Sequence, residues 1–151
     1  MKTPIAIVLV ALALATATGA SAYHFSPVRA AVHLHGKLTF TPNEGNGQPF
    51  TCSVTLDLKT KPLKTGPSII KAVKFPHGDC QGVEFDGFPW GVQILNANSG
   101  AFGGGSYASA DGICVTDETH FQDNGSGIWT LPVGGCLSGT LTSNPPTTIV
   151  K

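Results

Sequence analysis

Residues 75–90 have the sequence FPHGDCQGVEFDGFPW, which places four aromatic residues, two prolines and one cysteine within sixteen positions. Its glycine and proline content excludes a helix. The pattern instead predicts the end of one strand, a turn anchored by a disulfide at Cys80, and a second strand that opens at Pro89-Trp90. We therefore expect the fold around this stretch to consist of strands joined by disulfide-held turns.

The segments on either side of this stretch alternate between apolar and polar residues, as half-buried strands do. Strands are expected at residues 32–40, 50–60, 68–75, 90–97, 107–108, 112–119, 128–133, 137–143 and 147–150. The glycine-rich residues 98–105 (NSGAFGGG) are expected to form a surface loop, and residues 121–127 (FQDNGSG) a turn. This series predicts an all-β fold and suggests a sandwich or a barrel. Of the two, we expect an Ig-like antiparallel β-sandwich of about eight short strands.

The first 22 residues have the three parts of a secretory signal peptide. Lys2 supplies a basic start, residues 5–17 an apolar run, and residues 20–22 a small-x-small cleavage site. The apolar run is shorter than the roughly 20 residues of a membrane-spanning helix. We therefore expect a helical signal peptide at residues 1–22 that is removed, a single domain at residues 23–151 without a transmembrane segment, and a secreted or periplasmic protein.

The charge balance excludes one class of partner. Removal of Lys2 with the signal peptide leaves eight of the nine Lys and Arg residues against nine Asp and Glu, a net charge of −1. No global basic field is therefore available to hold nucleic acid. Charged residues make up only 12% of the chain, which is typical of an exported all-β protein.

Four cysteines, Cys52, Cys80, Cys114 and Cys136, follow the expected signal peptide. An even number in this context indicates two disulfides, and the close C-x-x-C pairs of a zinc site are missing. Each half of the domain repeats one pattern, in which a cysteine opens a strand, a hairpin follows, and a second cysteine comes just past the return strand. Because antiparallel pairing brings the ends of such a unit together, we expect bridges between Cys52 and Cys80 and between Cys114 and Cys136.

His33 and His35 share the outward face of one expected strand, a spacing that lets two side chains approach one metal ion. A third ligand would have to come from His24, His77 or His120. No carboxylates lie at matched spacing, so a solvated polar face explains the pair better, and we expect no metal.

A calcium site is the second metal hypothesis. Asp117, Glu118, Asp123 and Asn124 surround a glycine turn, but the EF-hand order D-x-[DN]-x-[DN]-G is absent. An ordinary Asp-Asn-Gly turn explains these residues without calcium.

Catalytic motifs are incomplete. Residues 104–108 (GGSYA) lack the last glycine of a G-x-S-x-G nucleophile motif. Glu84 or Asp86, among aromatic neighbours, could supply the acid in an apolar pocket that glycosidases need. Their alternation with Val83 and Phe85 favours the polar positions of a strand instead. We therefore expect no enzymatic activity and no cofactor.

Five lysines, Lys59, Lys61, Lys64, Lys71 and Lys74, belong to one expected hairpin, whereas acids cluster at residues 79–86 and 111–123. An ordinary solvated face accounts for these lysines. The alternative is a dipolar molecule that meets anionic polysaccharide, or its own neighbour, through the hairpin.

Phe85, Phe88 and Trp90 also admit two interpretations. They could form an exposed platform on which sugar rings stack. A tryptophan packed by a disulfide is a common arrangement in β-sandwiches, so Phe88 and Trp90 are expected in the core.

Several short motifs resemble one protein family. They are Gly-x-Leu-x-Phe at residues 36–40, Cys52 at the start of an alternating strand, Gly-Asp-Cys at residues 78–80, Phe-Pro-Trp at residues 88–90, and CLSGTLTSNP at residues 136–145. Together they resemble the small secreted bacterial proteins labelled protein activator of alkane oxidation, the PraB-like family. The resemblance covers most of the chain after residue 22. It implies an exported, non-enzymatic, β-rich protein linked to growth on hydrocarbons.

We therefore expect an accessory or structural protein at the bacterial cell exterior that acts through its surface and helps cells to contact hydrophobic substrate. A binding module for polysaccharide or a hydrophobic ligand is the alternative, and a hydrolase fits less well. Partners are expected among cell-surface or extracellular material or further copies of the chain. Self-association would use the terminal strands at residues 32–40 and 147–150 and the arm at residues 23–31, since unpaired sheet edges invite another chain. The alternative is that both ends pair within the domain and the protein stays monomeric.

Overall fold

The computed structural model describes residues 23–78, 80 and 82–151, so the expected signal peptide at residues 1–22 lies outside the described residues. Within these ranges the chain forms strands and one short 3-10 turn, η1 (Leu63–Thr65), and no α-helix. The strands are β1 (His24–Ser26), β2 (Ala31–Phe40), β3 (Phe50–Lys59), β4 (Ser68–Lys74), β5 (Glu84–Phe85), β6 (Trp90–Asn96), β7 (Ser99–Phe102), β8 (Tyr107–Ser109), β9 (Gly112–Cys114), β10 (Thr119–Asp123), β11 (Ile128–Leu131), β12 (Leu137–Asn144) and β13 (Thr148–Val150). No helix in the described ranges is long and apolar enough to cross a membrane. The predicted all-β class is confirmed.

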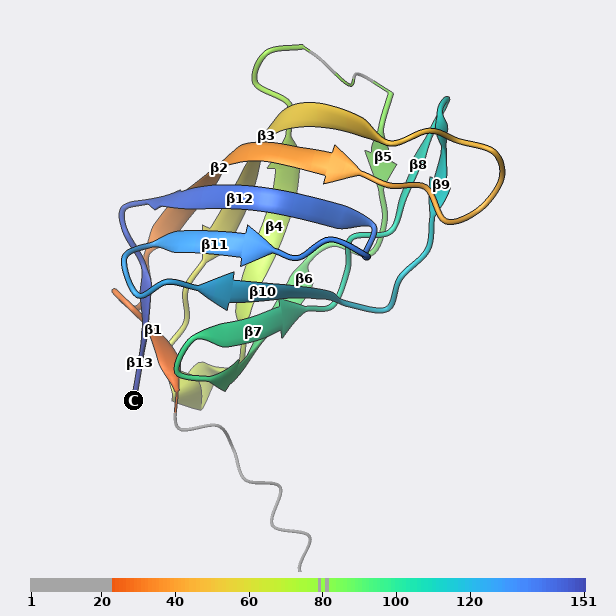
Figure 1. Ribbon diagram of the computed structural model, residues 1–151. Helices are drawn as coiled ribbons and strands as arrows, with labels where there is room; N and C mark the ends of the chain where they lie inside the picture. The colour runs from red at the N-terminus through yellow and green to blue at the C-terminus, as the bar shows by residue number, and fades with distance from the viewer. Residues whose placement is uncertain (1–22, 79, 81) are drawn as a thin grey trace, which may run out of the picture.

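Eight strands form one closed barrel in the order β2-β3-β4-β6-β7-β10-β11-β12, and β12 pairs back onto β2 (Figure 1). Every neighbouring pair in the barrel is antiparallel. The chain therefore runs up and down around the barrel in sequence order and leaves it only for two small additional sheets. The predicted Ig-like sandwich is wrong, because the strands close into a single sheet instead of forming two facing ones.

The barrel closes through two strands that the sequence pattern assigns to a loop and a turn. β7 lies within the glycine-rich residues 98–105, and β10 overlaps residues 121–127. β7 pairs with β6 on one side and with β10 on the other. A Cβ on Gly100 would lie 2.5 Å from Phe121 Cζ. Gly100 is therefore a strand position covered by an aromatic ring, where any side chain would displace that ring.

The seam between β2 and β12 contains two glycines, of which Gly36 pairs with Leu141 and Gly139 pairs with Leu38. A Cβ on Gly36 would collide with the carbonyl oxygen of Thr140, and one on Gly139 with that of Lys37. Glycine at both positions lets the two backbones bend and approach where the barrel closes. β2 is consequently paired on both sides, by β12 and β3. The expectation that residues 32–40 form an unpaired sheet edge is wrong.

The two ends of the barrel are capped differently (Figure 1). At the ribbon end, which lies at the lower left, β1 and β13 pair with each other, so both terminal segments are paired within the domain. There Phe25 stacks on Trp129 with ring centroids 5.5 Å apart. At the disulfide end, on the right, β5, β8 and β9 form a three-stranded sheet. Tyr107 of β8 packs edge-on against Phe40 of β2 at 5.2 Å.

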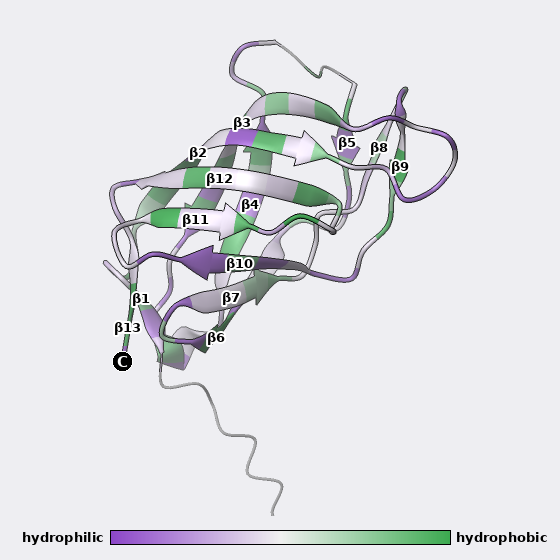
Figure 2. Ribbon diagram, viewed as in Figure 1, coloured by the Kyte–Doolittle hydropathy of each residue, from purple (hydrophilic) through white to green (hydrophobic). Residues whose placement is uncertain are grey.

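Apolar side chains from alternate strand positions fill the barrel, and the strands in Figure 2 change between green and paler or purple along their length. On β2, Val32, Leu34 and Leu38 are at most 1% exposed, as the alternation predicts. Phe121 stacks on Trp129 with ring centroids 3.9 Å apart. Full burial stabilises by about 1.5–3 kcal/mol for each aliphatic or phenyl side chain, so this packed interior is the main source of stability.

Candidate functional site

Both disulfides lie at the disulfide end and tie outlying segments to the rim of the barrel. The structure joins Cys52 to Cys80 with their Cα atoms 6.0 Å apart, and Cys114 to Cys136 at 5.6 Å. This is the pairing expected from the two hairpin units. The described residues contain no free cysteine. The cysteines therefore anchor the cap, and none of them in the described residues has a free thiol that could react.

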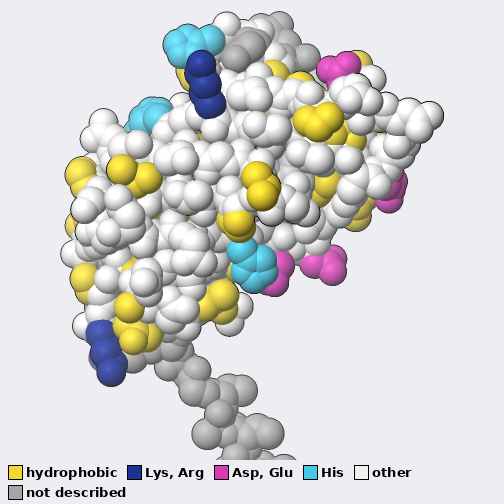
Figure 3. Space-filling model, viewed as in Figure 1, with side chains coloured by type: hydrophobic (Ala, Val, Ile, Leu, Met, Phe, Trp, Pro, Cys, Tyr) yellow, Lys and Arg dark blue, Asp and Glu magenta, His cyan; other side chains and the backbone are white. Residues whose placement is uncertain are grey.

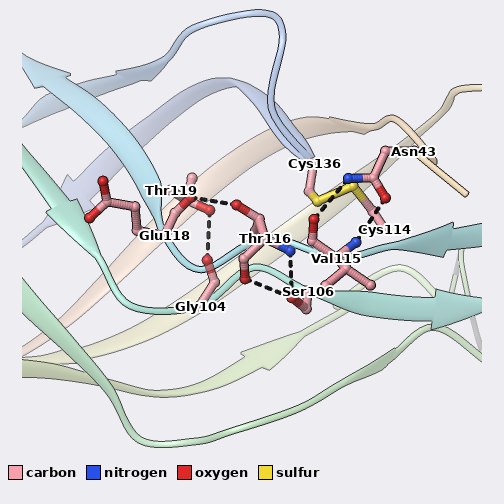
Figure 4. The surroundings of a disulfide bond; sticks show 9 residues. All are labelled: Asn43, Gly104, Ser106, Cys114, Val115, Thr116, Glu118, Thr119 and Cys136. Carbon is pink, nitrogen blue, oxygen red and sulfur yellow. Dashed lines mark hydrogen bonds between the residues drawn. A yellow bond between two sulfur atoms is a disulfide. The ribbon is translucent and has the colours of Figure 1, made fainter.

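Hydrogen bonds from side chains to the backbone surround the second bridge (Figure 4). Asn43 Nδ2 donates to Val115 O at 2.8 Å, and Asn43 Oδ1 accepts from Val115 N at 2.9 Å. Ser106 Oγ donates to Thr116 O and accepts from Thr116 N, both at 2.8 Å. These bonds satisfy backbone groups that leave the sheets between β9 and β10. The side chains of Asn43 and Ser106 are thus occupied in holding the cap together.

The two residues predicted as core aromatics have different environments. Trp90 is 0% exposed, and its Nε1 donates to Asp86 O at 2.8 Å. Phe88 is 37% exposed and stacks on Trp90 with ring centroids 4.4 Å apart. The core position is right for Trp90 and wrong for Phe88, because Phe88 lies in the link before β6 and covers Trp90 from outside.

His33 and His35 lie on the outer wall of the barrel and are engaged with side chains of β3. His33 Nδ1 lies 2.9 Å from Asp57 Oδ1, and His35 Nδ1 lies 3.0 Å from Thr55 Oγ1. Lys74 Nζ lies 2.6 Å from Asp57 Oδ2. Burial raises the pKa of Asp57, but hydrogen bonds and charge from Lys74 and His33 outweigh it and hold that pKa below its usual value.

The other histidines do not complete a metal site with this pair. His120 Nε2 lies 2.8 Å from Glu118 Oε1, His24 lies in the terminal ribbon, and His77 is exposed after β4. Within the part of the chain that the structure describes, no group of three or more His, Cys, Asp or Glu side chains could hold a metal ion.

The residues considered for calcium form a turn. Asp123 Oδ1 accepts from Gly125 N at 2.7 Å, and Asn124 Oδ1 accepts from Ser126 N at 2.8 Å and Ile128 N at 3.1 Å. Asp123 is 3% exposed. Burial raises the pKa of its carboxyl group, and this effect outweighs the hydrogen bond from Gly125, which lowers that pKa. The two acids considered for glycoside hydrolysis, Glu84 and Asp86, are exposed at the disulfide end.

The five hairpin lysines do not form one surface. Lys74 is paired with Asp57, and Lys64 and Lys71 are exposed in η1 and on the wall of β4. Lys59 and Lys61 instead line one hollow of about 360 Å³ at the ribbon end, together with Arg29. We call this the cationic hollow. Arg29 was not singled out from the sequence, because no motif links it to the hairpin.

Hydrogen bonds of Thr60 fix the backbone that forms the cationic hollow. Thr60 is 0% exposed, and its Oγ1 donates to Pro27 O at 2.8 Å and accepts from Ala30 N at 2.9 Å. Its backbone N donates to Ala30 O at 3.0 Å. These three bonds fix the segment before β2 against the end of β3. Arg29 is thereby held with φ 56°, in the left-handed region that few non-glycine residues adopt.

A groove of about 570 Å³ shares Lys61 with the cationic hollow as a lining residue. Its lining comes from the arm before and in β1, the η1 segment and β6, and the apolar members are Tyr23, Phe25, Leu63, Pro67, Val92 and Ile94. Lys61 also lines this groove, and its backbone N is fixed by Ser68 Oγ at 3.0 Å. We call it the ribbon-end groove. Its size falls within the range of small-molecule sites.

Charge is distributed unevenly between the two barrel ends. Six exposed acids belong to segments at the disulfide end: Glu44, Glu84, Asp86, Asp111, Asp117 and Glu118. On the face in Figure 3, acidic side chains (magenta) lie on the right and Lys or Arg (dark blue) at the lower left and top. Exposed acids are thus concentrated at the disulfide end, whereas the five hairpin lysines do not share one surface.

These features define a small, disulfide-bonded antiparallel β-barrel with packed interior, capped ends and a groove beside a cationic hollow. The model of one family, described as alkane oxidation protein activator PraA/PraB-like, matches residues 1–151. The chain belongs to this family, as its resemblance to PraB-like proteins predicts. No curated protein and no solved structure matches the chain at a significant level.

Proposed function

We propose that this protein is an exported, non-enzymatic accessory protein that supports alkane use from the periplasm or the cell exterior. Membership of the alkane oxidation activator family, over the whole chain, carries the proposal. Two disulfides support an oxidising compartment. Removal of residues 1–22 as a signal peptide would provide the route.

The exposed apolar side chains support action through the surface. In the described residues, large apolar side chains at least 37% exposed lie toward one barrel end or the other. Val28, Leu63 and Leu95 belong to the ribbon end, and Phe88, Ile113, Val115 and Val133 to the disulfide end. Exposed polar side chains such as Lys37, Gln122 and Thr130 lie on the wall between them. This distribution favours contact of the ends with apolar material while the wall stays hydrated.

Deletion of the gene tests the proposal. We expect the deletion strain to grow more slowly than its parent on hexadecane and equally well on hexadecanoate, because growth on hexadecanoate requires no alkane oxidation. The full chain should restore growth and appear outside the cytoplasm without residues 1–22. A chain without residues 2–22 should not restore it. Equal growth of deletion strain and parent on hexadecane would contradict the proposal.

A binding module for a hydrophobic ligand is the second candidate function. The ribbon-end groove favours it, because apolar side chains converge there beside one cation. The two functions are compatible, since an accessory protein outside the cell can act by carrying an apolar molecule.

A further inference from the structure

We infer that the ribbon end binds an anionic amphiphile, a free alkyl carboxylate whose chain lies in the ribbon-end groove and whose carboxylate meets the cationic hollow. The inference rests on the proposed function, of which it names the ligand class. An alkyl carboxylate is the compound that oxidation of an alkane's terminal carbon finally gives.

The first argument is charge. Arg29, Lys59 and Lys61 line one hollow. Within the described ranges, none of the three makes an ion pair, since the ion pairs there join His33 and Lys74 to Asp57 and His120 to Glu118. Three cations gathered without a counter-charge repel one another, and a bound anion relieves that repulsion. The hollow therefore favours an anionic group.

The second argument is preorganisation. Thr60 is fully buried and bonds both Pro27 O and Ala30 N, which fixes the backbone on either side of Arg29 against the end of β3 before any ligand arrives. Ser68 Oγ likewise fixes the backbone of Lys61. A site whose backbone is already fixed loses less conformational entropy when it binds. The bonds of Thr60 hold Arg29 at a φ of 56°, which is a strained backbone conformation for a residue other than glycine.

The third argument is the continuity of the two features. Lys61 lines both the cationic hollow and the ribbon-end groove. The groove offers the accessible apolar side chains of Leu63, Pro67 and Ile94 to an aliphatic chain, and the hollow that shares Lys61 with it offers cations. A ligand with only a chain leaves the cations unpaired, and a ligand with only a charge leaves the groove empty. An alkyl chain that ends in a carboxylate uses both.

Titration calorimetry of the mature protein tests the inference with dodecanoate below its micelle concentration. We expect saturable binding of one molecule per chain. Each buried methylene should change the affinity by about fourfold, so octanoate should bind at least tenfold more weakly. Dodecyltrimethylammonium, which has the same chain and the opposite charge, should also bind at least tenfold more weakly.

Matched variants locate the site. Lys59→Gln combined with Lys61→Gln should weaken dodecanoate binding at least tenfold, and Arg29→Gln should weaken it several-fold. Lys71→Gln, an exposed lysine of the same hairpin outside the hollow, should leave it unchanged. Leu63→Ser should weaken binding several-fold, whereas Leu95→Ser should not, because Leu95 has similar exposure but lies outside the groove. Circular dichroism checks that each variant is folded.

Several outcomes would overturn the inference. One is equal binding of dodecanoate and dodecyltrimethylammonium, which would indicate non-specific apolar adsorption. Another is binding to vesicles of anionic phospholipid but not to monomeric dodecanoate, which would assign the surface to a membrane. A third is association of the cationic hollow with the acidic end of a second copy, seen by sedimentation and abolished by the Lys59/Lys61 variant. A protein that restores growth on hexadecane without binding dodecanoate would defeat this inference and leave the proposed function intact.

Discussion

The backbone of Gly104 lies against the indole ring of Trp90, so closely that a Cβ at residue 104 would overlap three ring atoms. Gly104 belongs to the link that follows β7, and Trp90 opens β6, so their contact holds this link on the barrel rim. The neighbouring Gly103 has only Gly91 O near such a Cβ, at 4.0 Å. Neither glycine has a left-handed φ. Close packing against Trp90, rather than a left-handed backbone conformation, therefore explains why residue 104 is glycine.

Gly104→Ala should destabilise the protein by about 1–3 kcal/mol, because the added methyl group must displace a tryptophan packed in the core. Gly103→Ala should change stability by less than about 0.5 kcal/mol. Urea unfolding of the two variants beside the wild type measures both values. Equal effects at the two positions would contradict the observed contact.

Trp90→Ala should cost about 3–5 kcal/mol, because it leaves a cavity against Phe102 and Phe85. Phe88→Ala should cost less than half as much, because the ring of Phe88 is 37% exposed. Thermal unfolding compares the variants. An unchanged melting temperature for Trp90→Ala would instead support an exposed sugar-stacking role for that ring.

The two disulfides should each contribute about 3 kcal/mol on the chain-entropy model, since they join residues 28 and 22 positions apart. Peptide mapping of unreduced mature protein should recover Cys52 linked to Cys80 and Cys114 linked to Cys136. Replacing both cysteines of one pair by alanine should lower the unfolding free energy. A reducing agent should then destabilise the variant less than the wild type. Any bridge between the two pairs would refute the assignment.

The strands were largely predictable from alternation, but the way they close was not. β2, β3 and β6 follow the expected pattern because each buries alternate large side chains. β7 carries Gly100, whose missing side chain makes room for the ring of Phe121, so its sequence resembles a flexible loop. Without β7 and β10 a closed ring of strands cannot be assembled, and a sandwich is the natural alternative. Burial of a glycine under a ring is a tertiary contact that sequence periodicity does not record.

Asp57→Asn should destabilise the protein at neutral pH by up to about 1 kcal/mol, because it removes a charge paired with Lys74 and His33. The folded state holds the pKa of Asp57 below its usual 3.8. Its contribution is therefore present above pH 3.8 and is lost as the pH falls through the folded pKa. The stability difference between variant and wild type should shrink in acid. Urea unfolding at pH 7 and pH 3 measures it, and a constant difference would contradict this role.

Asp123 should have the opposite pH dependence. Burial raises its pKa above 3.8, so folding favours the protonated form. Its contribution is fully present below pH 3.8 and is lost as the pH rises through the raised folded pKa. Asp123→Asn should therefore become more stable relative to the wild type between pH 3 and pH 7. A relative stability that falls over this range would show that the charged carboxylate is favoured instead.

The candidate site was only partly predictable. The sequence pattern indicated Lys59 and Lys61 as members of one hairpin. It grouped Lys71 and Lys74 with them, although neither lines the hollow and Lys74 pairs with Asp57. Arg29 joins the hollow through the bonds of Thr60, and Phe25 joins the groove because β1 pairs with β13. Both placements depend on contacts between segments at least 30 residues apart in the chain. A pattern confined to neighbouring residues cannot indicate them.

The central claim is that this protein supports alkane oxidation from outside the cytoplasm without being the catalyst. The most direct measurement is the rate of hexadecane oxidation by the deletion strain after purified mature protein is added to cells with a permeabilised outer membrane, so that the protein reaches both the periplasm and the cell exterior. The account predicts that added protein restores the parental rate, and that the same protein alone with hexadecane forms no oxidised product. Failure of added protein to restore the rate, while expression of the full chain inside the same cells does, would contradict the account, as would oxidation of hexadecane by the purified protein itself.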